Sequence, residues 1–166
     1  VARASMPFAE QYSADMVYEL RGMSEGSGVS LDELMMLQIR NQLQPEGDAG
    51  CTSFAVTEPS SSGAVVGQNW DNDPGLDPYT VVLTRRPEGK SALMTITQAG
   101  LISYIGLNGS GIGVCLNTLP APSRVLGVPH YFTVRGIYET GSLTDAVQAV
   151  RRAHRAIPAN VILVTP

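Results

Sequence analysis

The sequence has only two cysteines in 166 residues and no long apolar stretch. A membrane-spanning helix needs about 20 consecutive apolar residues, and a secretory signal needs an apolar core behind a basic start, so we expect neither. The two cysteines form no CxxC pair, and only two histidines are present, which argues against a zinc site or a disulfide framework. We therefore expect no metal, no cofactor and a reducing, cytoplasmic location.

Positive charge is also scarce. The sequence has eleven basic and fifteen acidic side chains, for a net charge of -4, and three of the arginines cluster at 151, 152 and 155. Neither nucleic acid nor a membrane surface is an expected partner. Residues 1–50 carry eight acidic and three basic groups, whereas residues 51–166 carry seven acidic and eight basic groups. The local net charge thus changes from negative to slightly positive near Cys51.

Hydrophobic periodicity changes at the same place. Before it, four apolar residues recur at helical spacing up to a glycine-rich stop at 26–28, namely Tyr12, Met16, Leu20 and Met23. Ser30 and Glu33 form a capping-box pattern, which predicts a second helix over about 31–42. The proline and glycines of residues 45–50 predict an exposed loop.

From Cys51 onward the period is two. Runs rich in β-forming residues predict strands at 51–57, 64–69, 79–85, 91–98, 101–106 and 112–118. Separators at 59–63, 87–90 and 108–109 are typical of hairpin turns, so the sheets should be mainly antiparallel. Ser142 predicts the start of a helix running to about His154, and a last strand follows at 160–164.

Several side chains in the β-rich part have a functional and a plain structural interpretation. Cys51 follows a glycine-rich loop, but a lone cysteine is usually a small buried apolar residue. Two amides, an indole and a carboxylate crowd residues 68–71, more polar capacity than a turn requires. Asn117 ends a strand and is either an edge residue or an amide donor. His130 is a candidate base for a cysteine.

Three motifs in this order resemble a known family. They are DAGCTS at 48–53, GQNWD at 67–71 and GLNGSGIGV at 106–114, followed by Asn117. They resemble the acyl-coenzyme A:6-aminopenicillanic acid acyltransferase (isopenicillin N acyltransferase) family of cysteine N-terminal nucleophile hydrolases, which is related to penicillin V acylase and bile salt hydrolase. The acidic stretch at 19–26 looks like the portion upstream of the family's nucleophile. The resemblance implies an α+β fold, a four-layer αββα sandwich of which this chain supplies part.

Residue by residue, the resemblance implies a role for each matching position. Cys51 would be the nucleophile and Gly50–Cys51 the self-cleavage site, while Asp71 would engage the new amino group and Asn117 would lie in the oxyanion region. The substrate and oxyanion region would further include Thr52, Ser53, Gln68, Asn69 and Trp70. Gln68 stands where the bile salt hydrolase branch has arginine, a departure that bears on that branch's substrate contacts.

The resemblance also implies two regions. Residues 1–50 would be a helical acidic pro-segment ending in an exposed cleavage loop, and residues 51–166 a β-rich catalytic region, truncated at its C-terminal end. After cleavage the pro-segment would be a partner of the 51–166 region. The other expected partner is a small acyl-amide substrate, with acyl-coenzyme A as an additional candidate acyl donor; a homo-oligomer is left open.

The chemistry of these residue types agrees with that assignment. A thiol is a strong nucleophile, and glycine presents its carbonyl without a side chain in the way. Cleavage would free the Cys51 α-amine, whose reference pKa of about 7.7–8.0 suits a general base near neutrality. We therefore expect a self-processing cysteine amidohydrolase or acyltransferase acting on a small acylated amine through a Cys51 thioester.

Two other functions stay open at this point. The chain could be a non-catalytic binding domain of the same fold in which Cys51 is simply buried. It could also be a Cys-His hydrolase that uses His130 as its base.

Overall fold

The computed structural model describes residues 1–43, 50–57, 64–119 and 126–166. It contains two antiparallel sheets, a five-stranded sheet in the order β3-β4-β5-β6-β7 and a hairpin of β1 and β2. The strands are β1 Cys51–Thr57, β2 Ala64–Trp70, β3 Thr80–Arg85, β4 Leu93–Gln98, β5 Ile105–Asn108, β6 Gly113–Thr118 and β7 Ala159–Val164. The helices are α1 Ala2–Tyr12, α2 Ala14–Ser27, α3 Leu31–Gln38, α4 Arg40–Leu43, the 3-10 helix η1 Pro74–Tyr79, α5 His130–Tyr138 and α6 Leu143–Arg152. The α+β class and the antiparallel pairing are confirmed.

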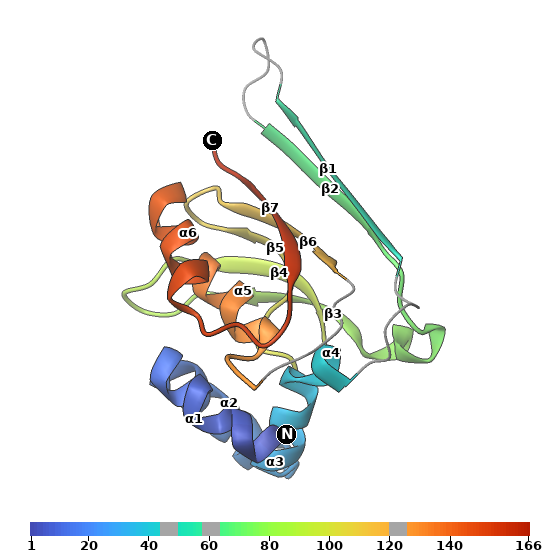
Figure 1. Cartoon of the computed structure of the whole chain (residues 1–166), viewed down its shortest axis with the longest axis vertical. Helices are drawn as coiled ribbons and strands as arrows, with labels where there is room; N and C mark the ends of the chain where they lie inside the picture. Colours follow the sequence, from blue (N-terminus) through green and yellow to red (C-terminus); the bar gives the residue numbers. More distant parts are fainter. Residues whose placement is uncertain (44–49, 58–63, 120–125) are drawn as a thin grey trace.

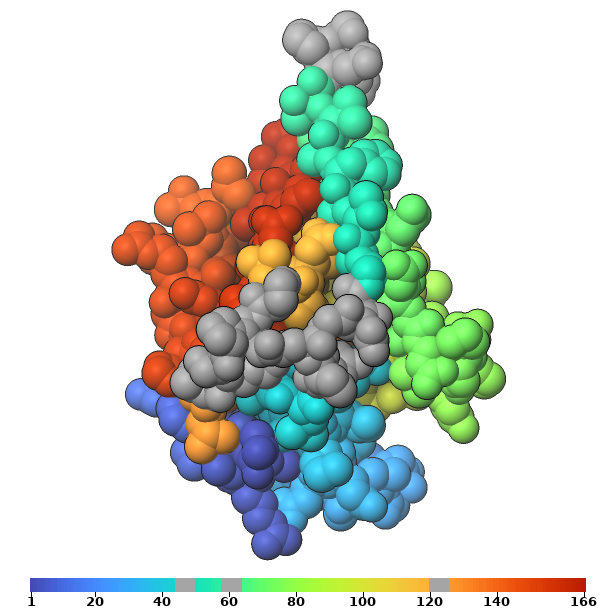
Figure 2. Space-filling model, turned by 45° about the vertical axis from the view of Figure 1, so that its right-hand side comes forward, coloured from blue at the N-terminus to red at the C-terminus, as the bar shows by residue number. Residues whose placement is uncertain are grey.

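The elements stack in layers (Figure 1). Helices α5 and α6 cover one face of the five-stranded sheet, and the β1-β2 hairpin packs on β6 and β7 from the other side. Figure 2 shows β1 alongside β7 at the surface. The outer face of the hairpin carries exposed Phe54, Val56 and Val65. The described residues thus provide a helix layer and two sheet layers of the αββα arrangement.

The side chains of β6 alternate between the two packed faces of the five-stranded sheet. Val114 and Leu116 are fully buried in the core, whereas a Cβ built on Gly113 would lie 3.1 Å from Val66 of β2. Successive side chains of a strand point to opposite faces, so the odd positions of β6 point towards the hairpin. Asn117 therefore faces the hairpin, where Cys51 begins β1.

The N-terminal helices follow from their caps. Ser13 accepts a hydrogen bond from the Met16 N–H, and Gly28 ends α2 at φ +76°, a backbone angle that favours glycine. Ser13 thereby divides the predicted 12–23 helix into α1 and α2. The predicted capping box of Ser30 and Glu33 is present at the start of α3. None of the described helices is long and apolar enough to cross a membrane.

These helices share one hydrophobic core with the rest of the chain. Met16, Leu20 and Met35 belong to the same buried cluster as Ile102 and Phe132. Burial of a large apolar side chain contributes about 1.5–3 kcal/mol. The N-terminal segment is therefore an integral part of the folded unit.

The strand predicted at 101–106 is wrong, because β5 begins only at Ile105. The Gln38 side chain of α3 binds the backbone just before it, donating to the Gly100 carbonyl at 2.7 Å and accepting from the Ile102 N–H at 3.3 Å. A helix side chain thus satisfies backbone groups that a neighbouring strand would otherwise pair. Helix α5, which the sequence pattern did not indicate, is buried at all nine positions and so has no polar face to reveal its period.

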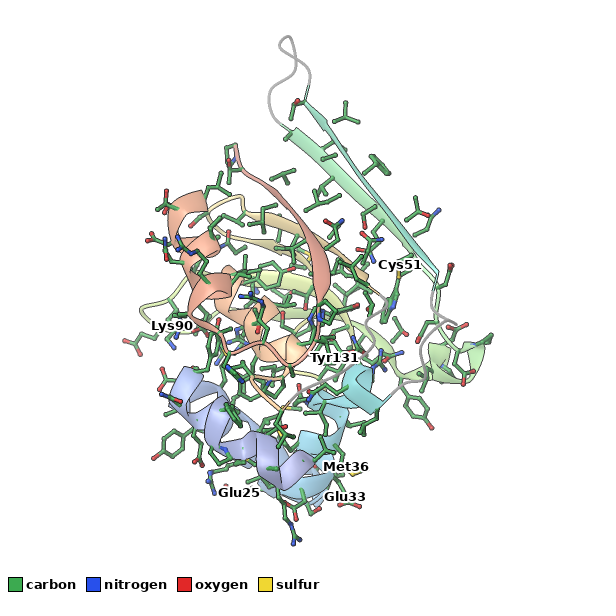
Figure 3. All side chains as sticks on the ribbon, in the orientation of Figure 1. Glu25, Glu33, Met36, Cys51, Lys90 and Tyr131 are labelled. Carbon is green, nitrogen blue, oxygen red and sulfur yellow. The ribbon has the colours of Figure 1, made fainter. Side chains whose placement is uncertain are left out.

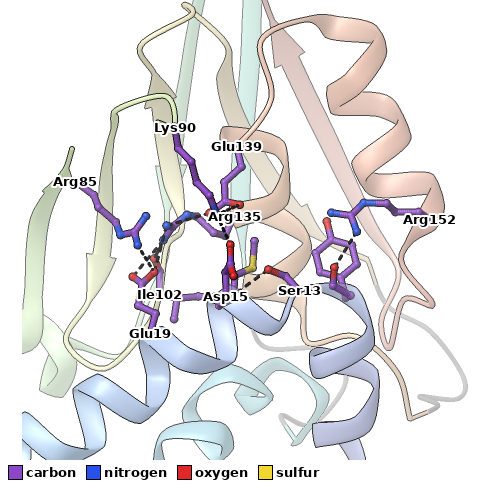
Figure 4. A network of polar contacts seen from close by, with 11 residues as sticks. Ser13, Asp15, Glu19, Arg85, Lys90, Ile102, Arg135, Glu139 and Arg152 are labelled. Atoms are coloured by element: carbon purple, nitrogen blue, oxygen red, sulfur yellow. Dashed lines mark hydrogen bonds and ion pairs between the residues drawn. The ribbon is translucent and has the colours of Figure 1, made fainter. Parts of the chain in front are cut away.

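A buried ion-pair network ties the N-terminal helices to the sheet and α5 (Figure 4). The fully buried Arg135 donates to both carboxylate oxygens of Glu19 on α2, at 3.3 and 3.2 Å, and to the Ile102 carbonyl at 3.1 Å. Arg85 at the end of β3 also pairs with Glu19, at 2.9 Å. Glu139 lies 3.2 Å from Arg135.

Glu19→Ala should destabilise the fold more than a surface charge deletion, because it leaves two guanidinium groups short of a partner. Since Arg135 keeps Glu139 and the Ile102 carbonyl, we expect a loss of about 2 kcal/mol in unfolding free energy, below the 3–5 kcal/mol of a fully orphaned buried charge. The control is Glu10→Ala, which breaks an exposed pair with Arg21 and should cost under about 0.5 kcal/mol. Urea unfolding of both variants tests this, and equal losses would contradict it.

Candidate active site

Cys51 lies at the end of the hairpin nearest α4 (Figure 3). It is half-buried and pairs across the hairpin with Trp70, and Ser53 pairs with Gln68 in the same register. These four side chains share the face that packs on β6 and β7. Thr52 and Asn69 pair with each other on the opposite, exposed face, so the structure does not bring them to the Cys51 side.

Asp71 lies directly against the predicted cleavage site. Its backbone N–H donates to the Gly50 carbonyl at 3.2 Å. Its carboxylate oxygen Oδ2 lies 2.6 Å from the point where a Cβ on Gly50 would stand. The carboxylate therefore lies beside the Gly50 Cα, an atom that is two bonds from the Cys51 nitrogen. It occupies space that a side chain at position 50 would fill.

Asn117 reaches Cys51 from β6. Its Nδ2 donates to the Cys51 carbonyl at 2.8 Å. The Asn117 amide thus binds the main chain of Cys51 rather than the Gly50 carbonyl. Asn117 is not an edge residue, because β6 lies between β5 and β7. Its cross-strand neighbour Asn160 donates to its Oδ1 at 3.5 Å, a contact that sequence spacing did not reveal.

Gln68 fastens the hairpin to the sheet. Its Nε2 donates to the Leu116 carbonyl at 2.6 Å, and its Oε1 accepts from the Leu116 N–H at 2.8 Å. The side-chain nitrogen and oxygen of Gln68 thus bind the carbonyl and N–H of one residue, as the backbone of a neighbouring strand would. Next to it, the Ser53 hydroxyl is buried with no hydrogen-bond partner in the described part of the chain.

Aromatic rings line the end of the sheet under Cys51. Trp70 packs edge-on against Tyr104 at 5.0 Å between centroids, and Tyr104 packs edge-on against Tyr131 at 5.1 Å. Burial raises the pKa of the Tyr104 phenol well above its usual value, and the nearby Tyr131 and Cys51 add to the rise. Tyr104 therefore stays a neutral phenol. Sequence reasoning missed both tyrosines, which lie far from Cys51 along the chain.

His130 is a poor base for Cys51. Burial lowers its pKa to about 4, so the ring is neutral and weakly basic near pH 7. Its ring neighbours are Tyr131 at 5.7 Å and Tyr104 at 6.2 Å. No hydrogen bond within the described ranges joins it to Cys51. Within the same ranges, no group of three or more histidine, cysteine, aspartate or glutamate residues could hold a metal ion.

Comparison with known families shows the family of this chain. Residues 56–166 match the family described as acyl-coenzyme A:6-aminopenicillanic acid acyl-transferase, and the chain belongs to that family. The match includes Asp71 and Asn117 and begins after Cys51.

A curated relative agrees. The acyl-coenzyme A:6-aminopenicillanic-acid-acyltransferase 40 kDa form of Emericella nidulans is 29% identical over 136 residues, which cover 80% of this chain. The aligned residues make up 38% of that relative, so the chain spans well under half of its length.

An amide-to-acid substitution tests whether the two hydrogen bonds between Gln68 and Leu116 hold the hairpin on the sheet. Gln68→Glu removes the donor to Leu116 and turns a carboxylate oxygen towards a carbonyl, so we expect a loss of about 2 kcal/mol in unfolding free energy. Asn69→Asp makes the same exchange one residue along, on the exposed face, and should change stability by under about 0.5 kcal/mol. Denaturant unfolding compares them. A Gln68→Glu protein as stable as the parent would show that these two hydrogen bonds do not stabilise the fold.

Proposed function

We propose that this chain is the self-processing part of a cysteine acyltransferase or amidohydrolase that acts on a small acylated amine. The observation that carries the proposal is the contact of Asp71 with Gly50, which sets a carboxylate and a backbone donor on the peptide preceding a half-buried cysteine. The hydrogen bond of Asn117 to the Cys51 carbonyl supports it by fixing the nucleophile's main chain.

The first step is an intramolecular acyl shift. The Cys51 sulfur attacks the Gly50 carbonyl carbon, and the thiol proton passes to the Cys51 nitrogen as the peptide C–N bond breaks. This leaves a Gly50 thioester on Cys51 and a free α-amine. Water then opens the thioester, giving a Gly50 carboxylate and the Cys51 thiol. The Asp71 N–H, already on the Gly50 oxygen at 3.2 Å, would stabilise the oxyanion that forms during attack.

The second step uses the amine that cleavage creates. An α-amine can accept the thiol proton, which the amide nitrogen before cleavage cannot do. Asp71, beside the same atoms, would orient this amine as the third member of a nucleophile, base and orienter set. Its charge also favours the ammonium form and so raises the pKa of the amine.

Turnover then follows the same path with an external substrate. Cys51 takes the acyl group from an amide, or from an acyl-coenzyme A thioester, and passes it to water or to an amine. The name of the Emericella relative contains both acyl-coenzyme A and 6-aminopenicillanic acid. We propose such a small amine and its acyl donor as the substrate class. Ser53 and Trp70 lie on the same face of the hairpin as Cys51. Asn117 would be a second oxyanion donor beside the Asp71 N–H.

The cleaved N-terminal segment would stay bound as a partner. Its helices share the hydrophobic core, and Glu19 remains paired with Arg85 and Arg135. Cutting one exposed peptide bond removes none of these contacts. Thiol chemistry of this kind agrees with a reducing, cytoplasmic compartment.

Processing is the direct test. The active protein should separate under denaturing conditions into fragments ending at Gly50 and starting at Cys51, detected by intact-mass measurement. Cys51→Ala should abolish cleavage and turnover without unfolding, because a methyl group cannot attack Gly50. Cys115→Ala is the control; this thiol is buried, which raises its pKa and suppresses its thiolate. A fully active single chain would refute the mechanism, and unreactive Cys51 in thiol labelling would favour a binding domain.

Gly50→Ala should slow cleavage by about tenfold or more, because the new methyl group would displace the Asp71 carboxylate that lies 2.6 Å from its position. Both residues are exposed, so the fold should survive the displacement. Gly26→Ala on α2 is the matched control, since a Cβ there meets nothing within 4 Å. Cleavage is followed by gel densitometry on freshly refolded protein. Equal rates for both variants would remove the Asp71 contact from the mechanism.

Asp71→Asn keeps the size of the side chain and removes its charge. On pre-processed protein we expect acylation to slow by more than about tenfold, or roughly 1.4 kcal/mol of barrier. Losing the negative charge lowers the pKa of the Cys51 amine, so the rising acidic limb of the rate profile should move to lower pH. Single-turnover acylation over a pH series measures both. An unchanged rate and limb, with lower melting temperature, would make Asp71 a loop cap instead.

A further inference from the structure

A buried polar chain connects the N-terminal segment to the aromatic residues under Cys51. The Nε of Arg40 donates to the Tyr131 hydroxyl at 2.7 Å, and that hydroxyl donates to Oδ1 of Asn41 at 3.0 Å. Arg40 also donates through Nη1 to Oε1 of Gln98. Asn41, Gln98 and Tyr131 are all buried. Because α4 is so short, these side chains rather than its own backbone hydrogen bonds fix it in place.

Asn41 reaches a second phenol through the first. Tyr131, whose hydroxyl donates to Asn41, packs edge-on against Tyr104 at 5.1 Å between centroids. The nearby Asn41 side chain also partly opposes the rise of the Tyr104 pKa. Tyr104 in turn packs on Trp70 at 5.0 Å, and Trp70 is the cross-strand partner of Cys51. Asn41 is thus linked to the Cys51 end of the hairpin through two phenol rings and one indole.

We infer that Asn41 is a positioning residue of the candidate active site, which sets the Tyr104 and Tyr131 rings on which the Cys51–Trp70 end of the hairpin rests. The inference rests on the proposed function and deepens it. It makes the N-terminal segment a component of the active site, because a residue that lies before the cleavage point holds side chains that lie after it.

The chemistry of the amide explains why asparagine suits this position. Its oxygen accepts from the buried Tyr131 hydroxyl without bringing a charge into the interior. Alanine cannot accept this hydrogen bond, and aspartate would add a charge. A buried polar group without its partner costs about 1–3 kcal/mol, so the phenols are expected to turn when the amide is removed.

Trp70 gives a direct readout, because it is the only tryptophan in the chain. We would compare Asn41→Ala with its parent in a Cys51→Ala background, which stays uncleaved, and measure acrylamide quenching of tryptophan fluorescence together with the melting temperature. Asn41→Ala should make Trp70 more accessible in a chain that is still folded, and Tyr131→Phe should do so more weakly. Tyr18→Phe, which removes an exposed hydroxyl, should leave quenching unchanged.

The second arm uses the processed enzyme with Cys51 present. Asn41→Ala should lower kcat by about tenfold with little change in KM, while the two fragments still co-elute, because a misplaced nucleophile slows chemistry more than binding. Unchanged quenching, or altered quenching with an unchanged kcat, would overturn the role of Asn41. Failure of the parent to cleave at Gly50–Cys51 would instead refute the proposed function, and the quenching arm would still decide whether Asn41 holds the rings.

Discussion

The docking of the β1-β2 hairpin on β6 is the constraint on which the candidate site depends. Gln68 donates one hydrogen bond to the Leu116 carbonyl and accepts one from the Leu116 N–H, and this pair fixes the position of the hairpin on the sheet. That placement puts the Cys51 carbonyl within reach of Asn117, and the hairpin register puts Asp71 beside Gly50. A shift of one residue would turn every inner side chain to the outer face. One half-buried side-chain amide therefore determines which groups lie next to Cys51.

The N-terminal segment supplies polar groups as well as apolar surface to this arrangement. Glu19 neutralises the buried Arg135, and Asn41 satisfies the phenol of Tyr131. Both contacts lie in the protein interior, where an unpaired polar group is costly and a paired one is strongly oriented. After the proposed cleavage they would make association of the segment specific, whereas the hydrophobic core would make it stable. Cleavage at Gly50 would cut the chain without touching either contact.

Local sequence patterns predicted much of the fold. The alternation of 51–57 and 64–69 gave the hairpin that carries Cys51, and Ser30 with Glu33 gave the start of α3. These patterns failed where contacts between residues distant in the sequence determine the local structure. Gln38 of α3 occupies the backbone before β5, and α5 is buried on all sides, so neither leaves a local signal. Asn41, Tyr104 and Asn160 were missed at the site for the same reason, because each is recognisable only from neighbours distant in the sequence.

The position of Asp71 has an electrostatic consequence for the proposed cleavage. Before the cut, Asp71 faces a neutral peptide whose carbonyl accepts its N–H. Hydrolysis replaces that peptide with a Gly50 carboxylate and a Cys51 ammonium. Because like charges repel and opposite charges attract, the same aspartate would repel the new C-terminus and attract the new N-terminus. Cleavage would thus clear Gly50 from Cys51 and retain the amine, which leaves the nucleophile open to substrate while the buried contacts of Glu19 and Asn41 keep the segment bound.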